Sequence, residues 1–112
     1  MRYIIKGHII LKMDPEFSLE NIEKIDKDFK DKVLKIFPNA DLFQTDYCDG
    51  IKYTLVYVCD DINYISMLNT FNSFAKSVRS GHIIIEDNYY NHLCGQLIFK
   101  NNTWEVCGRG DK

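Results

Sequence analysis

The residues with the most reactive side chains gather in one short segment. Residues 86–92 contain two carboxylates, two phenols and an imidazole, from Glu86, Asp87, Tyr89, Tyr90 and His92. Groups of these types can transfer protons in general acid–base catalysis. However, the sequence offers no nucleophile with a recognisable partner base and no glycine-rich loop of the kind that holds phosphate. We therefore expect neither an enzyme nor a bound cofactor.

A second group of residues has the chemistry of metal ligands. His92, Cys94 and Cys107 would lie on one side of a C-terminal hairpin, where they could offer three ligands to a tetrahedral zinc. Their spacing matches no zinc signature, and a fourth ligand would have to come from elsewhere in the chain. Isolated cysteines are more often small core residues. We therefore predict no metal site.

The segment 86–92 also suits contact with another protein. Tyrosine supplies a large contact area at a small cost in conformational entropy, so Tyr89 and Tyr90 are typical of binding loops. A second candidate surface is the outer face of the helix expected after residue 60, where small uncharged residues such as Thr70 are flanked by Met67 and Phe74. Another protein, or a second copy of the chain, could cover such a low-charge face.

The sequence thus favours a small, non-catalytic protein-binding domain whose contact residues are those of segment 86–92 together with Met67, Thr70 and Phe74. An inhibitor or an immunity-type (anti-defence) factor of a bacterium, phage or mobile element would fit the size of the chain. An expected homodimer would form through the outer face of the second helix. The partner of the binding domain is expected to be another protein of unknown identity.

Nucleic-acid binding is the main alternative function. The run from Lys52 to Tyr57 places two tyrosines on one strand and resembles the aromatic strand of an RNA-recognition motif. The first strand lacks the companion aromatic pair apart from Tyr3. The formal net charge of −2 also argues against it, because nucleic-acid-binding domains cluster Lys and Arg. A ligand-sensing domain or an enzyme is the third alternative.

Composition bounds the domain organisation. A chain of 112 residues with 46% hydrophobic and 13% aromatic residues predicts a single globular domain over residues 1–112, with 108–112 as a flexible tail. Lys6, His8 and Lys12 interrupt the apolar residues at the N-terminus, so no signal peptide is expected. No run reaches the roughly 18–20 apolar residues of a membrane helix. We expect a cytoplasmic protein with reduced cysteines and no membrane contact.

Alternation and helical periodicity predict the first elements. Residues 2–12 alternate as a strand that buries Tyr3 and its same-face neighbours. From residue 19 to residue 37, apolar positions recur at helical spacing, with Ser18 as the expected N-cap and Pro38 beyond the end. The pair Asp49-Gly50 between residues 41–47 and 51–59 predicts a hairpin with Phe43 opposite Val56. Either face of this hairpin could be buried.

A second helix and three more strands complete the prediction. The helix is expected to be capped by Asp60 or Asp61, to bury Ile65 among other residues, and to end near Arg79, before Ser80-Gly81. Strands then follow at 82–86, 93–100 and 103–107. The order β-α-β-β-α-β resembles the ferredoxin-like pattern. We expect an α+β fold with both helices on one face of an antiparallel sheet, which the C-terminal hairpin extends.

Overall fold

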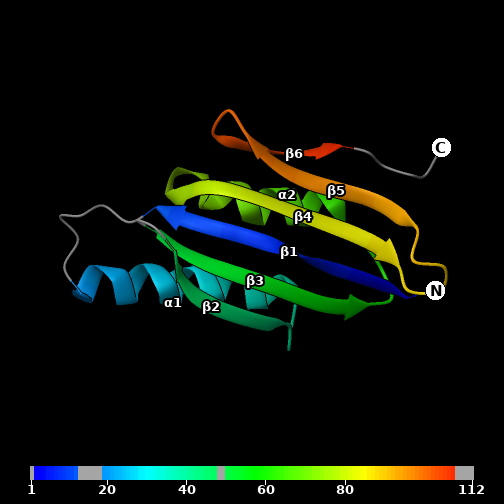
Figure 1. Ribbon diagram of the computed structural model, residues 1–112, viewed down its shortest axis with the longest axis horizontal. Helices are drawn as coiled ribbons and strands as arrows, with labels where there is room; N and C mark the ends of the chain where they lie inside the picture. Colours follow the sequence, from blue (N-terminus) through cyan, green and yellow to red (C-terminus); the bar gives the residue numbers. More distant parts are fainter. Residues whose placement is uncertain (1, 13–18, 48–49, 108–112) are drawn as a thin grey trace.

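Six strands form one antiparallel sheet, and two helices cover one of its faces (Figure 1). This computed structural model describes residues 2–12, 19–47 and 50–107. The elements are β1 (Tyr3–Lys12), α1 (Leu19–Ile36), β2 (Asp41–Tyr47), β3 (Gly50–Cys59), α2 (Tyr64–Ser73), a single 3₁₀ turn (Ala75–Ser77), β4 (Val78–Asp87), β5 (Leu93–Lys100) and β6 (Thr103–Cys107). The strands lie in the order β2-β3-β1-β4-β5-β6. An α+β architecture with an antiparallel sheet and two helices, as predicted, is confirmed.

The hydrophobic core lies between the sheet and the two helices. Ile5, Ile9 and Leu11 of β1 are almost fully buried on the face that meets the helices, as their alternation predicted. The buried helix residues that pack with this cluster are Phe29, Val33, Phe37, Met67, Phe71 and Phe74. Burying one such side chain contributes about 1.5–3 kcal/mol, so the helices are held mainly by this layer. The expected cap Ser18 and the expected tail 108–112 lie outside the described residues.

The β2–β3 hairpin pairs in a different register from the predicted one. Phe43 lies opposite Thr54, not Val56, and Tyr47 lies opposite Gly50. Gly50 also pairs with Lys12 of β1, so this glycine belongs to a three-stranded ladder and not to the centre of the turn. The shift is two residues, and it therefore leaves each side chain on its predicted face. The buried face is the one that carries Tyr53 and Leu55.

The second helix is shorter than predicted at both ends. Its N-cap is Asn63, whose side-chain oxygen accepts a hydrogen bond from the Ser66 amide at 3.0 Å, and not Asp60 or Asp61. The helix ends at Ser73, and β4 begins at Val78. Val78 is fully buried and pairs with Leu11 of β1. Pairing with a distant strand therefore overrides the local helical pattern of residues 75–79.

Two glycines of the sheet make room for aromatic rings. Gly81, predicted as a helix terminator, lies inside β4, where a Cβ atom would collide with the Trp104 ring. Gly95 of β5 lies in the same way against the ring and hydroxyl of Tyr64 from α2. Glycine is required at these positions because backbone and ring approach closely.

The C-terminal hairpin has the predicted register, with Phe99 opposite Trp104. Asn101 and Asn102 connect its strands with positive φ angles of 53° and 65°, as a type I′ turn requires. The side chain of Asn72 in α2 fastens this hairpin to the helix layer. Its Oδ1 accepts hydrogen bonds from the Trp104 amide at 2.8 Å and from the Thr103 hydroxyl at 3.2 Å.

Candidate functional site

The predicted contact segment connects β4 to β5 at one end of the sheet (Figure 1). We call residues 87–93 the aromatic loop. Its backbone is closed by hydrogen bonds from the Asp87 amide to the His92 carbonyl at 2.9 Å and from the Asn91 amide to the Asp87 carbonyl at 2.8 Å. Asn91 has a φ of 56°, which asparagine tolerates better than most residues. The Asn88 amide also donates to the Arg2 carbonyl at 2.8 Å, so the loop is tied to the start of β1.

Asp87 holds the loop from inside. Its side chain is buried, with 6% exposure, and its Oδ1 accepts a hydrogen bond from the Tyr89 amide at 2.7 Å. The side chain therefore satisfies a backbone donor of the loop, and it is not available to a partner. The expected contact role of Asp87 is corrected to a positioning role, because the loop turns over its carboxylate.

Three aromatic rings project from this loop. Tyr89 is 79% exposed and Tyr90 is 64% exposed. Their ring centroids lie 5.0 Å apart, and the Tyr90 ring stacks on the His92 ring at 5.6 Å. Leu93, 47% exposed, follows directly in β5. The structure thus brings together the predicted contact residues Tyr89, Tyr90 and His92 as one exposed aromatic cluster on a fixed backbone.

Glu86 is separated from this cluster. It pairs with Ile4 across the sheet and forms a salt bridge with Lys6 at 2.6 Å. Its side chain therefore lies on the face of the sheet opposite the helices, which we call the open face. An acid–base group made of Glu86 and the loop rings is not assembled.

Two of the three residues of the second predicted contact surface, on α2, are buried and cannot contact a partner. Met67 and Phe74 are 2% and 7% exposed, because they point into the core beside Phe71. Thr70 is half-buried. Ile65, predicted to be buried, is instead 74% exposed. The helix is therefore rotated relative to the predicted one, and its outer face presents an isoleucine where a buried stripe was expected.

The candidate metal ligands remain dispersed. Cys107 lies opposite Gln96 in the β5–β6 hairpin, so it is diagonal to Cys94, as predicted. The Cys94 thiol donates to the carbonyl oxygen of His92, 3.5 Å away. Burial, together with the negative charge of Asp87, raises the pKa of the Cys94 thiol and disfavours the thiolate that zinc requires. No group of three or more candidate metal-binding side chains occurs within residues 2–12, 19–47 and 50–107.

The tyrosines of the predicted aromatic strand face the helices. Tyr53 is fully buried, packs on Phe29 at a centroid distance of 4.2 Å and donates a hydrogen bond to the Asp26 carboxylate. Tyr57 packs on Phe37. The platform expected for the nucleic-acid alternative is therefore not formed by these two residues, because alternation turns them away from the open face.

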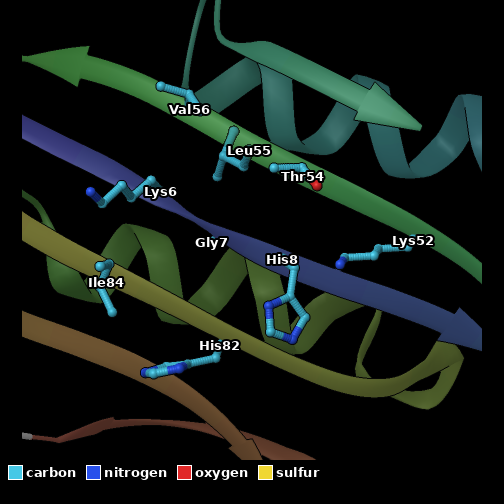
Figure 2. A pocket seen from close by; sticks show the side chains of 9 residues that line it. All are labelled: Lys6, Gly7, His8, Lys52, Thr54, Leu55, Val56, His82 and Ile84. Carbon is cyan, nitrogen blue, oxygen red and sulfur yellow. The ribbon is translucent and has the colours of Figure 1, made fainter. Parts of the chain in front are cut away.

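The sequence analysis did not predict a depression on the open face that is lined by both polar and apolar residues (Figure 2). The depression measures about 440 Å³, and its residues come from β1, β3 and β4: Lys6, Gly7, His8, Lys52, Thr54, Leu55, Val56, His82 and Ile84. His8 lies directly opposite Thr54 on one side and His82 on the other. His82 Nε2 lies 2.6 Å from Gln96 Oε1 on β5. The available signal was the mixed polar face of residues 2–12, which carries Lys6 and His8.

Comparison with known proteins gives no relative from which a role could be taken. No protein-family model matches the sequence, and no curated protein is similar enough to count as a relative. The two helices of the described chain are each too short or too polar to cross a membrane.

Proposed function

We propose that the protein acts by binding another protein, with the aromatic loop as its principal contact. The observation that carries this proposal is the exposed cluster of Tyr89, Tyr90 and His92 on a backbone closed by its own hydrogen bonds. A solvated loop has no need to expose two large rings. Tyrosine is enriched among the residues that dominate protein–protein binding energy, because each ring covers a large area with few rotatable bonds.

The fixed backbone of the loop strengthens this proposal. A partner that binds a mobile loop must order it first, which weakens the complex. Here the Asp87 carboxylate and the bond from Asn88 to Arg2 order the loop in the free protein. The stacking of Tyr90 on His92 restricts the rings themselves. The loop is therefore preorganised, and most of the contact energy of the rings is available for binding.

The nature of the partner follows from the polarity of the cluster. Phenol and imidazole groups combine an apolar body with hydrogen-bonding tips, which suits a protein surface that contains both apolar and polar atoms. The charged neighbours of the loop already have partners, since Glu86 pairs with Lys6 and Arg2 pairs with Asp60 at 3.4 Å. We therefore expect an interface centred on ring packing and not on ion pairs.

The test is quantitative capture of a partner from a lysate of the source organism, followed by affinity measurement. Combined Tyr89→Ala and Tyr90→Ala substitution should abolish capture, or weaken affinity by at least about a hundredfold, since each ring is expected to contribute about 2 kcal/mol. The free energy of unfolding should change by less than about 0.5 kcal/mol, because both side chains are exposed.

Phe43→Ala is the matched control. Phe43 is an aromatic residue with 61% exposure on the edge strand β2, at the other side of the sheet. Its removal should leave capture unchanged. If the loop variant captures the partner as well as the wild type, the aromatic loop is not the contact.

The proposal also covers the type of binding protein, its cellular location, its fold relationship and its oligomeric state. An inhibitor or immunity-type factor acts by occupying a partner's surface, and a rigid projecting loop on a small domain suits that action. A cytoplasmic location, a ferredoxin-like relationship of the β2-β3-β1-β4 portion, and dimerisation through the outer face of α2 belong to the same proposal. The exposed Ile65 supports the last of these, and light scattering of an Ile65→Glu variant would test it.

A further inference from the structure

We propose that the aromatic loop receives an arginine side chain of the partner protein, whose planar guanidinium group stacks on the exposed rings of Tyr89 and Tyr90. This inference rests on the protein-binding function proposed above, and it names the chemistry of the partner at that site. Two observations carry it. The rings expose much of their surface, and the end of the sheet that carries the loop is negatively charged.

The rings of the loop offer exposed π surface to a ligand. Tyr89 is 79% exposed, Tyr90 is 64% exposed, and His92 is exposed beside them. A cation over the face of an aromatic ring is attracted by the ring quadrupole, and arginine makes this contact more often than lysine. The hydrogen bonds that close the loop hold the rings in place before a ligand arrives. The rings can therefore receive a guanidinium group without rearrangement.

The end of the sheet that carries the loop has an excess of negative charge. Tyr3 of β1 pairs with Cys59 of β3 and with Asp87 of β4, so residues 60–61 and the aromatic loop leave the sheet at the same end. The charged side chains described there are the carboxylates Asp60, Asp61, Glu86 and Asp87 and the cations Arg2 and Lys6. Both cations are engaged in salt bridges, with Asp60 and Glu86. The charges of Asp61 and Asp87 are therefore not offset by an ion pair within the described part of the chain.

Cys94 reports this negative potential from a position next to the loop. Its thiol donates to the His92 carbonyl oxygen, 3.5 Å away. Burial raises the pKa of the Cys94 thiol, and the negative charges of Asp87 and Glu86 raise it further. The same carboxylates that disfavour a thiolate there favour a cation. They act at a distance, so the contact itself remains ring packing and not an ion pair.

Two other occupants fit these observations less well. Single-stranded nucleic acid can stack its bases on exposed tyrosines, but its phosphates would be repelled by the carboxylates at this end of the sheet. A methylated ammonium group is bound within a cage of separated rings. Here the Tyr89 and Tyr90 centroids lie 5.0 Å apart and the Tyr90 ring stacks on His92, so the rings contact one another and enclose no such space. A planar guanidinium group needs only one exposed ring face.

The test is an NMR titration of the full chain with a tripeptide, alanyl-arginyl-alanine, blocked at both ends. The ring signals of Tyr89, Tyr90 and His92 should shift and saturate with a Kd on the order of 10 mM or below. The same peptide with citrulline, a neutral isostere of arginine, should bind about three- to tenfold more weakly, because it lacks the charge that the rings and the carboxylates attract. The lysine peptide should also bind more weakly than the arginine peptide, because an ammonium group does not stack.

Asp87→Asn is the decisive variant, since it removes a charge and keeps an oxygen that accepts from the Tyr89 amide. It should weaken binding of the arginine peptide about two- to fivefold and leave binding of the citrulline peptide unchanged. Glu23→Gln removes the same charge from an exposed position of α1, and it should change neither affinity. If Asp87→Asn fails to fold, the exposed Asp61→Asn takes its place, with an expected loss of about twofold.

The outcomes separate the arginine from the function on which it rests. Equal affinity for the arginine and citrulline peptides, or tighter binding of the lysine peptide, would overturn the proposal. Saturation by oligothymidylate alone would assign the rings to nucleic acid. Tighter peptide binding by Arg109→Gln would assign them to the chain's own Arg109, which lies outside the described residues, and reject the partner's arginine. If Tyr89→Ala with Tyr90→Ala abolishes partner capture while the arginine and citrulline peptides bind equally, only the arginine is rejected and the protein-binding function stands.

Discussion

Replacing Asp87 by alanine would separate the positioning of the aromatic loop from its contacts. The buried carboxylate accepts the Tyr89 amide at 2.7 Å, and Asp87→Ala leaves that donor without its partner. Loss of a hydrogen bond to a charged acceptor costs about 1.5–3 kcal/mol. Since each 1.4 kcal/mol is a factor of ten, hydrogen exchange of the Tyr89 amide should accelerate by about ten- to a hundredfold. NMR-detected amide exchange measures this directly and needs no partner.

Asp87→Asn is the matched control, because an asparagine oxygen occupies the same place as the carboxylate oxygen and still accepts from the Tyr89 amide. Its exchange should stay within about tenfold of wild type, since a neutral hydrogen bond retains about 0.5–1.5 kcal/mol. Partner affinity should fall in Asp87→Ala although both exposed rings remain. Equal exchange of the Tyr89 amide in the wild type and Asp87→Ala would refute the positioning role and the preorganisation argument with it.

Two further predictions concern the core that supports the sites. Gly81→Ala should lower the free energy of unfolding by at least about 1–3 kcal/mol, because the new methyl would lie 2.8 Å from Trp104 Cζ2; denaturant unfolding followed by circular dichroism measures this. In a Trp104→Leu background the same substitution should cost markedly less. Equal costs in both backgrounds would contradict the steric explanation. Tyr53→Phe should cost about 1.5–3 kcal/mol at neutral pH through loss of the bond to Asp26. Burial, that bond and the charge of Asp26 raise the pKa of Tyr53 far above its usual 10.0. The stabilisation by the neutral Tyr53 is therefore present below pH 10 and declines as the pH rises further. If the free energy of unfolding falls with pH above 10 as steeply in Tyr53→Phe as in the wild type, Tyr53 is not the cause of that fall.

The sequence pattern correctly predicted those elements whose conformation is determined by residues close to them in the sequence. The alternation of β1 placed Ile5 and Ile9 in the core, and the Asn101-Asn102 turn gave the register of the last hairpin. Residues 74–79 were assigned to the second helix because Ser80-Gly81 is typical of a helix end. Ala75–Ser77 instead form a 3₁₀ turn, and the strand that begins at Val78 depends on pairing with β1, which is distant in the sequence.

Only those features of the candidate site that depend on local sequence could be predicted. Exposed Tyr89 and Tyr90 follow from loop composition alone. The burial of Asp87 does not, because it depends on how the loop folds back over β4. The depression around His8 and Lys52 could not be found from spacing, since it requires the strand order that places β1 between β3 and β4.

The single amide of Asn72 has a consequence for how the molecule opens. It joins the tip of the last hairpin to α2, so β6 cannot peel from the sheet edge without breaking bonds to the helix layer. An edge hairpin added to a sheet would otherwise be the first unit to unfold. We expect this clasp to make the hairpin part of the same cooperative unit as the core.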